Sequence, residues 1–123
     1  MRRFSSVVLF AALTLMAQEA HAADADVGAR VFKAQCGTCH AVVAGRTITG
    51  PSMFGIVGRK VSADPAFHYS AASKAGDFTW TEAKLDEYLA NPKAAMPGTS
   101  MMFNGLKNDD QRADVVAYLA TLK

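Results

Sequence analysis

The feature that most constrains this chain is the run Cys36-Gly37-Thr38-Cys39-His40. Two thiols stand three positions apart, and an imidazole follows the second thiol directly. The spacing C-x-x-C-H is typical of covalent haem attachment, in which each thiol bonds a vinyl group and the histidine ligates the iron. The rest of such a chain must fill or leave open the second axial position, keep the haem dry and expose one edge of it.

Other uses of the two cysteines, which are the only ones in the chain, explain less of the pattern. A disulfide that closes so short a loop would constrain the unfolded chain little. A thioredoxin-like redox pair needs a strand–helix context, which the surrounding sequence does not show. A zinc site needs a fourth ligand, and His68 stands in a segment without ligand-like spacing. Haem attachment is the interpretation that uses Cys36, Cys39 and His40 together.

The first 22 residues have the pattern of a secretory signal peptide. Met1-Arg2-Arg3 is basic, Val7 to Ala17 is apolar except for Thr14, and Ala20-His21-Ala22 is an A-x-A cleavage site. The apolar run is shorter than the roughly 20 residues that span a bilayer. We predict cleavage after Ala22 and export to the periplasm, with an uncleaved N-terminal anchor as the alternative.

The expected mature chain, residues 23–123, has a nearly balanced charge. Cleavage removes Arg2, Arg3 and Glu19, so the formal charge falls from +2 to +1. Such a balance gives no sign of nucleic-acid or membrane-surface binding. We expect one monohaem domain that acts as a monomer.

Capping residues and apolar spacing predict an all-α fold with three principal helices and no strand. Asp24 or Asp26 is expected to cap a first helix over about 27–35. Gly28 lowers the stability of this helix, since glycine is unfavourable in a helix interior. Its expected use is to let another helix approach closely. The apolar side of this helix is expected to comprise Val27, Val31 and Ala34, with Phe32 beside them.

A short helix is expected over 70–75, and Thr79-x-x-Glu82 has the spacing of a capping box that opens a helix through about Ala90. Asn91-Pro92 is expected to end that helix, because the residue before proline avoids the helical region. Asn108 is expected to cap the last helix. Its apolar side is Val115, Val116, Tyr118, Leu119 and Leu122.

Two segments are expected to be loops: 41–66, which contains several glycines and prolines and has no helical or strand period, and 93–107, which is rich in Met, Pro and Gly. Loops of this length are unusual in a small domain that packs on its own. They are expected where the chain wraps a large apolar cofactor that serves as its core. The expected fold is therefore three helices plus long haem-wrapping loops.

The second axial ligand decides the function. The candidates are His68, Met53, Met96, Met101 and Met102. The irregular segment 96–103 can point its side chains where a helix would not, and a methionine paired with histidine raises the reduction potential. Spacing alone does not separate Met101 from Met102. An open position would instead favour a haem peroxidase or a gas-binding sensor.

Further motifs accompany the cysteine run: Thr49-Gly50-Pro51, Gly58-Arg59-Lys60, Phe67-x-Tyr69-Ser70, Trp80, Tyr88-Leu89-x-Asn91-Pro92-Lys93 and Pro97-Gly98-Thr99-x-Met101-x-Phe103-x-Gly105. With these motifs, residues 26–123 resemble class I cytochromes c, of the branch that includes mitochondrial cytochrome c and bacterial cytochrome c2. The resemblance implies that Met101 is the axial ligand. It also implies that the Pro51 carbonyl accepts the free N–H of His40, which orients the ring.

The resemblance assigns roles to other residues as well. The side chains expected around the haem propionates are Arg59, Tyr69, Ser70, Trp80 and Thr99. It places Tyr88 near the sulfur of Met101 and Phe103 over the haem edge. It also implies that Gly28 and Phe32 meet Tyr118 and Leu119 where the first and last helices cross. Ser73 departs from the branch, which often has asparagine there, so the polar network beside the propionate is expected to differ.

The expected function is that of a soluble periplasmic one-electron carrier with haem c, and not of an enzyme or a binder of a small-molecule substrate. Its partners would be membrane or periplasmic redox proteins, and it would be either a general shuttle or dedicated to one dehydrogenase. Lys33, Lys93 and Lys107 are expected near the docking face, while Gln35, Ala94 and Ser100 stand at positions that are often basic. This implies weak electrostatic steering.

Overall fold

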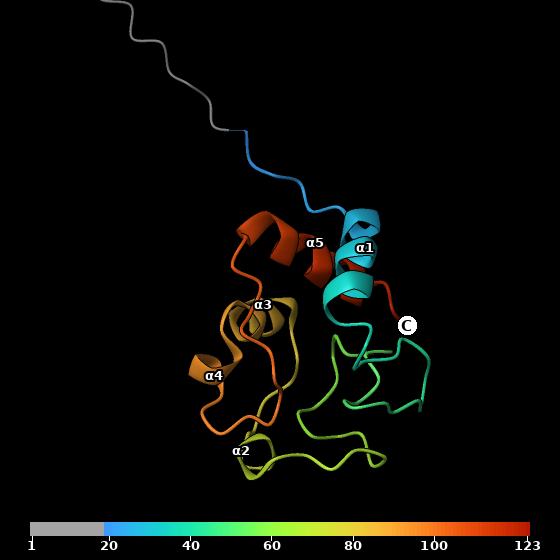
Figure 1. The fold of residues 1–123 in the computed structure, drawn as a ribbon, viewed down its shortest axis with the longest axis vertical. Coiled ribbons are helices and arrows are strands. Elements are labelled where there is room, and N and C mark those ends of the chain that lie inside the picture. Colours follow the sequence, from blue (N-terminus) through green and yellow to red (C-terminus); the bar gives the residue numbers. More distant parts are fainter. Residues whose placement is uncertain (1–18) are drawn as a thin grey trace, which may run out of the picture.

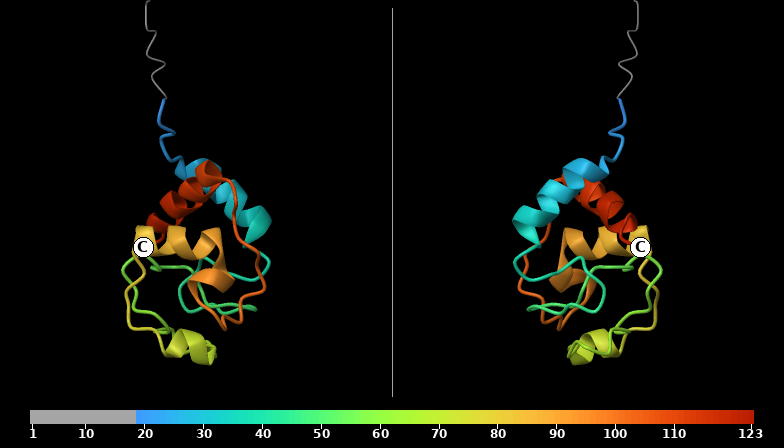
Figure 2. Two further views of the ribbon diagram at one scale, coloured as in Figure 1. Left: turned by 90° about the vertical axis from the view of Figure 1, so that its left-hand side faces the viewer. Right: turned by 90° about the vertical axis from the view of Figure 1, so that its right-hand side faces the viewer.

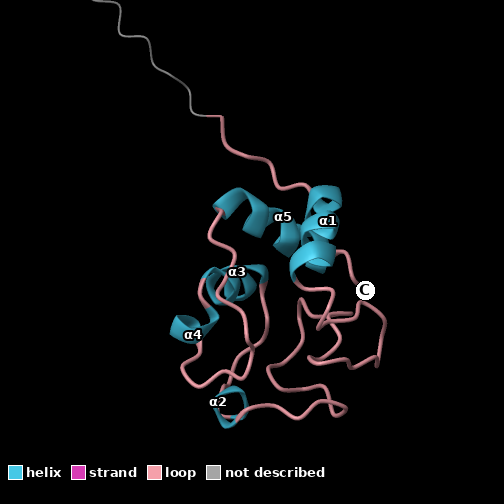
Figure 3. Cartoon of the chain, in the orientation of Figure 1, coloured by secondary structure: helices cyan, strands magenta, loops and turns pink. Residues whose placement is uncertain are grey.

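The computed structural model describes residues 19–123, and most of the predicted signal peptide lies outside this range. The described residues contain helices and no strand, apart from two isolated bridges, His40 with Thr47 and Lys60 with Thr79 (Figure 3). The helices are α1 (Ala25–Gln35), α2 (Ala71–Lys74), α3 (Glu82–Ala90), α4 (Pro92–Ala95) and α5 (Asp109–Ala120). The all-α prediction is confirmed. No helix in residues 19–123 is long and apolar enough to cross a membrane.

The first and last helices cross at one end of the molecule (Figure 1). A Cβ at Gly28 would lie only 1.9 Å from the carbonyl oxygen of Asp114, so no larger residue fits there without moving a backbone. Beside this contact, the rings of Phe32 and Tyr118 are 5.6 Å apart. The predicted close approach at Gly28 and the Phe32–Tyr118 contact are therefore confirmed.

The expected inward position of Ala34 is wrong, because that residue is exposed. Gly28 and Phe32, four positions apart, are the buried residues of α1. Ala34 follows Phe32 by two positions and so points about 200° away around the helix. Val27 and Val31 are partly buried at the edge of the contact.

Apolar side chains from α1, α3 and α5 meet in a common core. Val115 of α5 is fully buried, and Leu85 and Leu89 are the buried residues of α3. The cluster comprises Phe32, Ile56, Leu85, Leu89, Leu106, Val115, Val116 and Leu119. In both side views the α1–α5 crossing lies at one end and α2 at the other, with the loops between them (Figure 2).

The predicted start of α3 needs correction. Thr81 is the N-cap, and its hydroxyl accepts from the N–H of Lys84 at 3.1 Å. Thr79 does not cap the helix, because it is held extended in the bridge with Lys60. The next residue, Trp80, donates its backbone N–H to Arg59 at 2.8 Å, which prevents the helix from starting earlier.

The short helix α4 lies in a segment that was expected to be a loop. Asn91 ends α3 and also caps α4, since its side chain accepts from the N–H of Ala94 at 3.3 Å. Pro92 occupies the first position of α4, where its missing N–H costs nothing. The dipeptide Asn91-Pro92 therefore marks a restart of the helix as well as an end.

The long loops are tied to each other by backbone hydrogen bonds. Gly58 donates to Trp80 at 2.7 Å, and Val61 donates to Phe78 at 2.9 Å. On the other side, a Cβ at Gly98 would be 3.2 Å from the methyl group of Ala72 in α2. The segment that carries Met101 thus lies against α2.

Candidate haem site

The cysteine motif begins where α1 ends. Cys36 caps the helix and donates its N–H to Phe32 at 2.8 Å, and the N–H groups of Cys39 and His40 both reach the carbonyl of Cys36 at 3.0 Å. This turn places Cys36, Cys39 and His40 directly after the end of the helix. Both cysteines are free thiols. Burial raises the pKa of Cys36 to about 11, so this sulfur is protonated at neutral pH.

The His40 ring is held in one orientation by its neighbours. Its Nδ1 lies 2.8 Å from the carbonyl oxygen of Pro51, and because a carbonyl can only accept, Nδ1 carries the hydrogen. A Cβ at Gly50 would lie 2.3 Å from the Cε1 atom of the ring, so only glycine leaves room for it. In the described residues, Nε2 has no hydrogen-bond partner. The arrangement leaves that nitrogen available to a metal.

Burial lowers the pKa of His40 below its ordinary value, and the positive charge of Arg59 lowers it further, while the bond to Pro51 acts in the opposite direction. The imidazole is therefore neutral at physiological pH. A neutral ring with one N–H donated and one lone pair free is the form of histidine that ligates metals.

A second group of polar contacts surrounds Met101. The oxygen atoms of Tyr88 and Thr99 are 2.7 Å apart, and the N–H of Met101 donates to the Thr99 hydroxyl oxygen at 3.3 Å. Burial raises the pKa of Tyr88, so its hydroxyl stays neutral. The ring of Trp80 packs on Tyr88 with centroids 5.2 Å apart. The structure thus brings Trp80, Tyr88, Thr99 and Met101 together.

The two adjacent methionines differ in exposure. Met102 is 94% exposed, whereas Met101 is partly buried. Phe103, the next residue, is partly buried and packs against the apolar core. Met101 and Phe103 are thus both partly buried, while Met102 between them points to solvent.

The remaining predicted site residues make their contacts within their own loops. Arg59 donates to the carbonyls of Ser52 at 2.7 Å and Phe54 at 3.3 Å. The hydroxyl of Tyr69 accepts from the N–H of Asp64 at 3.2 Å, and Ser70 caps α2. In residues 19–123, no hydrogen bond joins Arg59, Tyr69 or Ser70 to His40 or Met101.

Ser62, which was not among the predicted site residues, is a partner of Ser73. Ser62 is the only non-glycine residue in the described chain with a positive φ, 56°, and its hydroxyl lies 2.8 Å from that of buried Ser73. Nothing in the local sequence indicates this conformation. The Ser62–Ser73 pair is the side-chain contact that Ser73 makes in this structure.

Of the three lysines expected near the docking face, Lys107 forms a hydrogen bond within the structure. The ammonium of Lys107 donates to the carbonyl of Ala90 at 2.7 Å, at the C-terminal end of α3. Leu106 donates its backbone N–H to Leu89 at 2.8 Å, so this segment satisfies two carbonyls of the helix end. Lys33 and Lys93 are exposed.

The sequence matches the cytochrome c family over residues 25–123. Cytochrome c2 of Rhodomicrobium vannielii is 46% identical over 122 residues, which cover 98% of this chain and 97% of that protein. Cytochrome c type-1 of Ascaris suum is 49% identical over 96 residues, which cover 78% of this chain and 86% of that protein. The solved structure of cytochrome cH from Methylobacterium extorquens superposes with a TM-score of 0.74 at 35% identity, covering 80% of this chain and 98% of that one.

A small all-α domain with the attachment motif C-x-x-C-H and a metal-ready histidine defines a c-type haem protein. The residues present fit that group, since both cysteines are free thiols and Nε2 of His40 has no hydrogen-bond partner in the described residues. The chain belongs to the cytochrome c family, as a class I c-type cytochrome. Members of this family are electron carriers with covalently attached haem, and their partners are redox proteins.

Proposed function

We propose that this chain is a soluble periplasmic one-electron carrier with a single haem c bound through Cys36 and Cys39. His40 and Met101 would be the two axial ligands. The observation that supports this proposal is the oriented ring of His40 with its free Nε2, together with a Met101 that is partly buried beside a 94% exposed Met102. The bound haem supplies an iron that cycles between the ferrous and ferric states.

The protein's own contribution is to hold both ligands in place. The Nδ1–H to Pro51 bond fixes the tautomer of His40 and increases the donor strength of Nε2. The Thr99 hydroxyl accepts from the N–H of Met101 and so restrains the backbone of the second ligand. We propose that Tyr88, bonded to Thr99, lies beside the sulfur and that Phe103 covers the haem edge. Two strong protein ligands leave no position for oxygen or peroxide.

The haem propionates require polar surroundings, because a buried unpaired charge is costly. We propose that these carboxylates lie among Arg59, Tyr69, Ser70, Trp80 and Thr99. A guanidinium has five N–H donors, and two carbonyls use part of that capacity in Arg59. The hydroxyl of Tyr69 accepts from Asp64, so its own hydrogen remains available to donate.

The periplasmic location rests on the pattern of residues 1–22. The match to cytochrome c2 of Rhodomicrobium vannielii covers 98% of the chain and therefore takes in most of this segment. That likeness supports a shared leader that is cut from the mature protein.

Electron transfer needs only brief contact through the exposed haem edge, so we propose a small, quickly released interface with membrane or periplasmic redox proteins, as in a respiratory chain. Lys33 and Lys93 would provide exposed positive charge at this face. Lys107 would also contribute charge, while its bond to Ala90 holds it at the end of α3.

The proposal predicts how the ferrous protein reacts with carbon monoxide, which binds only to an open or displaced axial position. The wild type is expected to bind it poorly, and Met101→Ala is expected to bind it readily. Met102→Ala is the matched control, because it removes the neighbouring, 94% exposed thioether. The measurement is a spectroscopic titration of the reduced protein. Carbon monoxide binding by the wild type as tight as by Met101→Ala would refute the ligand assignment.

A further inference from the structure

One carboxylate of the last helix is buried and has no part in the haem site. The Asp114 side chain of α5 is only 4% exposed. Its Oδ1 accepts from the backbone N–H of Asp24 at 2.7 Å and lies 2.8 Å from Nε2 of His21. A buried carboxylate depends on such partners, because an uncompensated buried charge is strongly destabilising. Asp114 also stands at the helix crossing, where its carbonyl oxygen faces Gly28.

The two partners of Asp114 stand on opposite sides of the proposed cleavage bond, Ala22–Ala23. Cleavage there removes His21 and retains Asp24, so the carboxylate loses the one basic side chain that pairs with it within residues 19–123. The same cut creates a positively charged α-ammonium on Ala23, directly before Asp24. The Cα atoms of consecutive residues are about 3.8 Å apart. Because the N–H of Asp24 already donates to Oδ1 of Asp114, the new ammonium on Ala23 is within reach of the same carboxylate.

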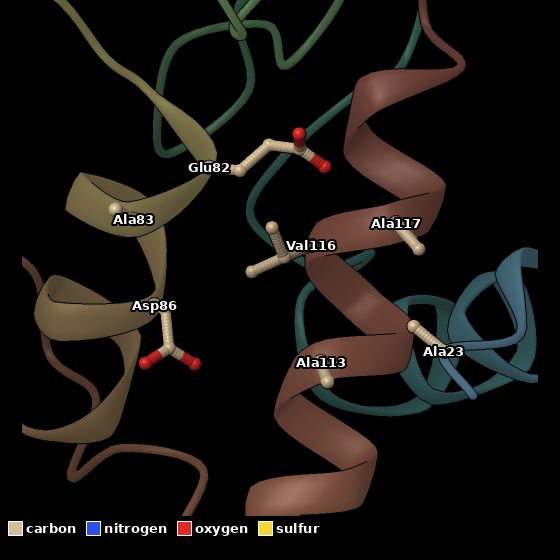
Figure 4. A pocket seen from close by; sticks show the side chains of 7 residues that line it. All are labelled: Ala23, Glu82, Ala83, Asp86, Ala113, Val116 and Ala117. Carbon is tan, nitrogen blue, oxygen red and sulfur yellow. The ribbon is translucent and has the colours of Figure 1, made fainter. Parts of the chain in front are cut away.

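The surroundings of Ala23 favour a positive charge. Ala23 lies beside α5 at the rim of a surface hollow of about 430 Å³ between α3 and α5 (Figure 4). Two carboxylates of α3, Glu82 and Asp86, also line this hollow. Asp86 is compensated by Arg112 at 2.7 Å, whereas Glu82 has no ion-pair partner within residues 19–123.

We propose that Asp114 is a binding site for the α-ammonium of the processed chain, which takes the place of the His21 imidazole after cleavage. This inference rests on the cleavage proposed above. Removal of the leader would then exchange one cation for another at the same carboxylate. The exchange would fasten the new N-terminus to α5 and keep α1, which leads directly into the haem-attachment motif, in its crossing position.

The exchange has a defined pH dependence. The hydrogen bond to Asp114 raises the pKa of His21, and the charges of Asp110, Asp114 and Asp24 act in the same direction. A cation whose pKa is raised by folding stabilises the fold fully below its unfolded pKa, and this stability is lost as the pH rises through the folded pKa. The ordinary pKa is about 6.5 for histidine and about 7.7–8.0 for an α-amino group. The processed chain therefore retains the ion pair to higher pH than the uncut chain.

The test uses the haem-loaded protein purified after export, with the start at Ala23 established by mass spectrometry. The pKa of its α-amino group is measured by NMR titration of the Ala23 methyl group. We expect a value above the ordinary range of about 7.7–8.0, with a return to that range in Asp114→Asn. Asp110→Asn is the matched control, since it removes one charge from the same helix without removing a hydrogen bond, and should shift the value less.

An ordinary α-amino pKa in the wild type, an equal shift in Asp114→Asn, or a mature start other than Ala23 would each overturn the inference. If Asp114→Asn does not fold, the α-amino pKa is compared between the wild type and Asp114→Glu, which retains the carboxylate charge. An α-amino pKa above the ordinary range in the wild type supports the inference, and an ordinary value overturns it. The visible spectrum of the same samples reports haem ligation separately, so a failure here is distinguishable from a failure of the proposed electron-carrier function.

Discussion

Gly50 shows how a single residue governs the orientation of the proposed iron ligand. Because a Cβ there would lie 2.3 Å from the His40 ring, Gly50→Ala must displace the ring or the Pro51 carbonyl that holds it. Overpacking of this kind costs about 1–3 kcal/mol.

We expect Gly50→Ala to lower the free energy of unfolding by about that amount, measured by denaturant titration, and to weaken axial ligation in the visible spectrum. Thr49→Ala, at the neighbouring exposed residue, should change neither quantity. A Gly50→Ala protein as stable as the wild type, with an unchanged spectrum, would show that the ring is not held by this contact.

At the scale of elements, the start of α3 offers a direct comparison between two threonines. The Thr81 hydroxyl caps the helix, and Thr79 lies in the preceding extended segment. Thr81→Ala is expected to cost about 1 kcal/mol, the usual value of a lost N-cap. Thr79→Ala is expected to cost much less, because its side chain is exposed and caps nothing. Thermal or denaturant unfolding of both variants checks the assignment, and equal losses would contradict it.

These elements also show where sequence reasoning succeeds. Asp24, Asn108 and Asn91 mark helix ends because their side chains meet N–H groups that the backbone leaves unpaired. The closeness of α1 and α5 at Gly28 follows from the missing side chain. Such features depend on local chemistry and can be predicted from the sequence.

Other features depend on contacts between distant segments and were not predictable. The capping-box spacing of Thr79 was overridden by its pairing with Lys60, 19 positions earlier. The left-handed backbone of Ser62 accompanies a hydroxyl contact with Ser73. The salt bridge of His21 with Asp114 spans 93 positions, and no local pattern in either segment indicates it. For the haem site itself, the spacing of Cys36, Cys39 and His40 predicted covalent attachment. The choice of Met101 over Met102 came from the resemblance to class I cytochromes c.

For the whole molecule, the proposed docking face predicts how ionic strength changes the rate at which the protein meets a partner. If Lys33 and Lys93 steer an acidic partner, the rate of electron transfer should fall modestly as ionic strength rises, because salt screens such attraction. Lys33→Gln and Lys93→Gln should lower the rate at low salt and converge with the wild type at high salt. Lys123→Gln, at the exposed last residue, is the control. The measurement is stopped-flow reduction by a redox partner at a series of salt concentrations. A rate of electron transfer that does not change with ionic strength would refute the proposal that Lys33 and Lys93 steer the partner.

The central claim is that the iron is held by His40 on one side and Met101 on the other. The mature chain would contain four methionines, Met53, Met96, Met101 and Met102. A methyl group held directly over the haem plane is strongly shielded by the ring current, so NMR of the ferrous protein with labelled methionine methyl groups tests the claim most directly. We predict one strongly shielded methyl signal that disappears in Met101→Ala and persists in Met102→Ala. The absence of such a signal in the wild type, or its loss in Met102→Ala instead, would contradict the account.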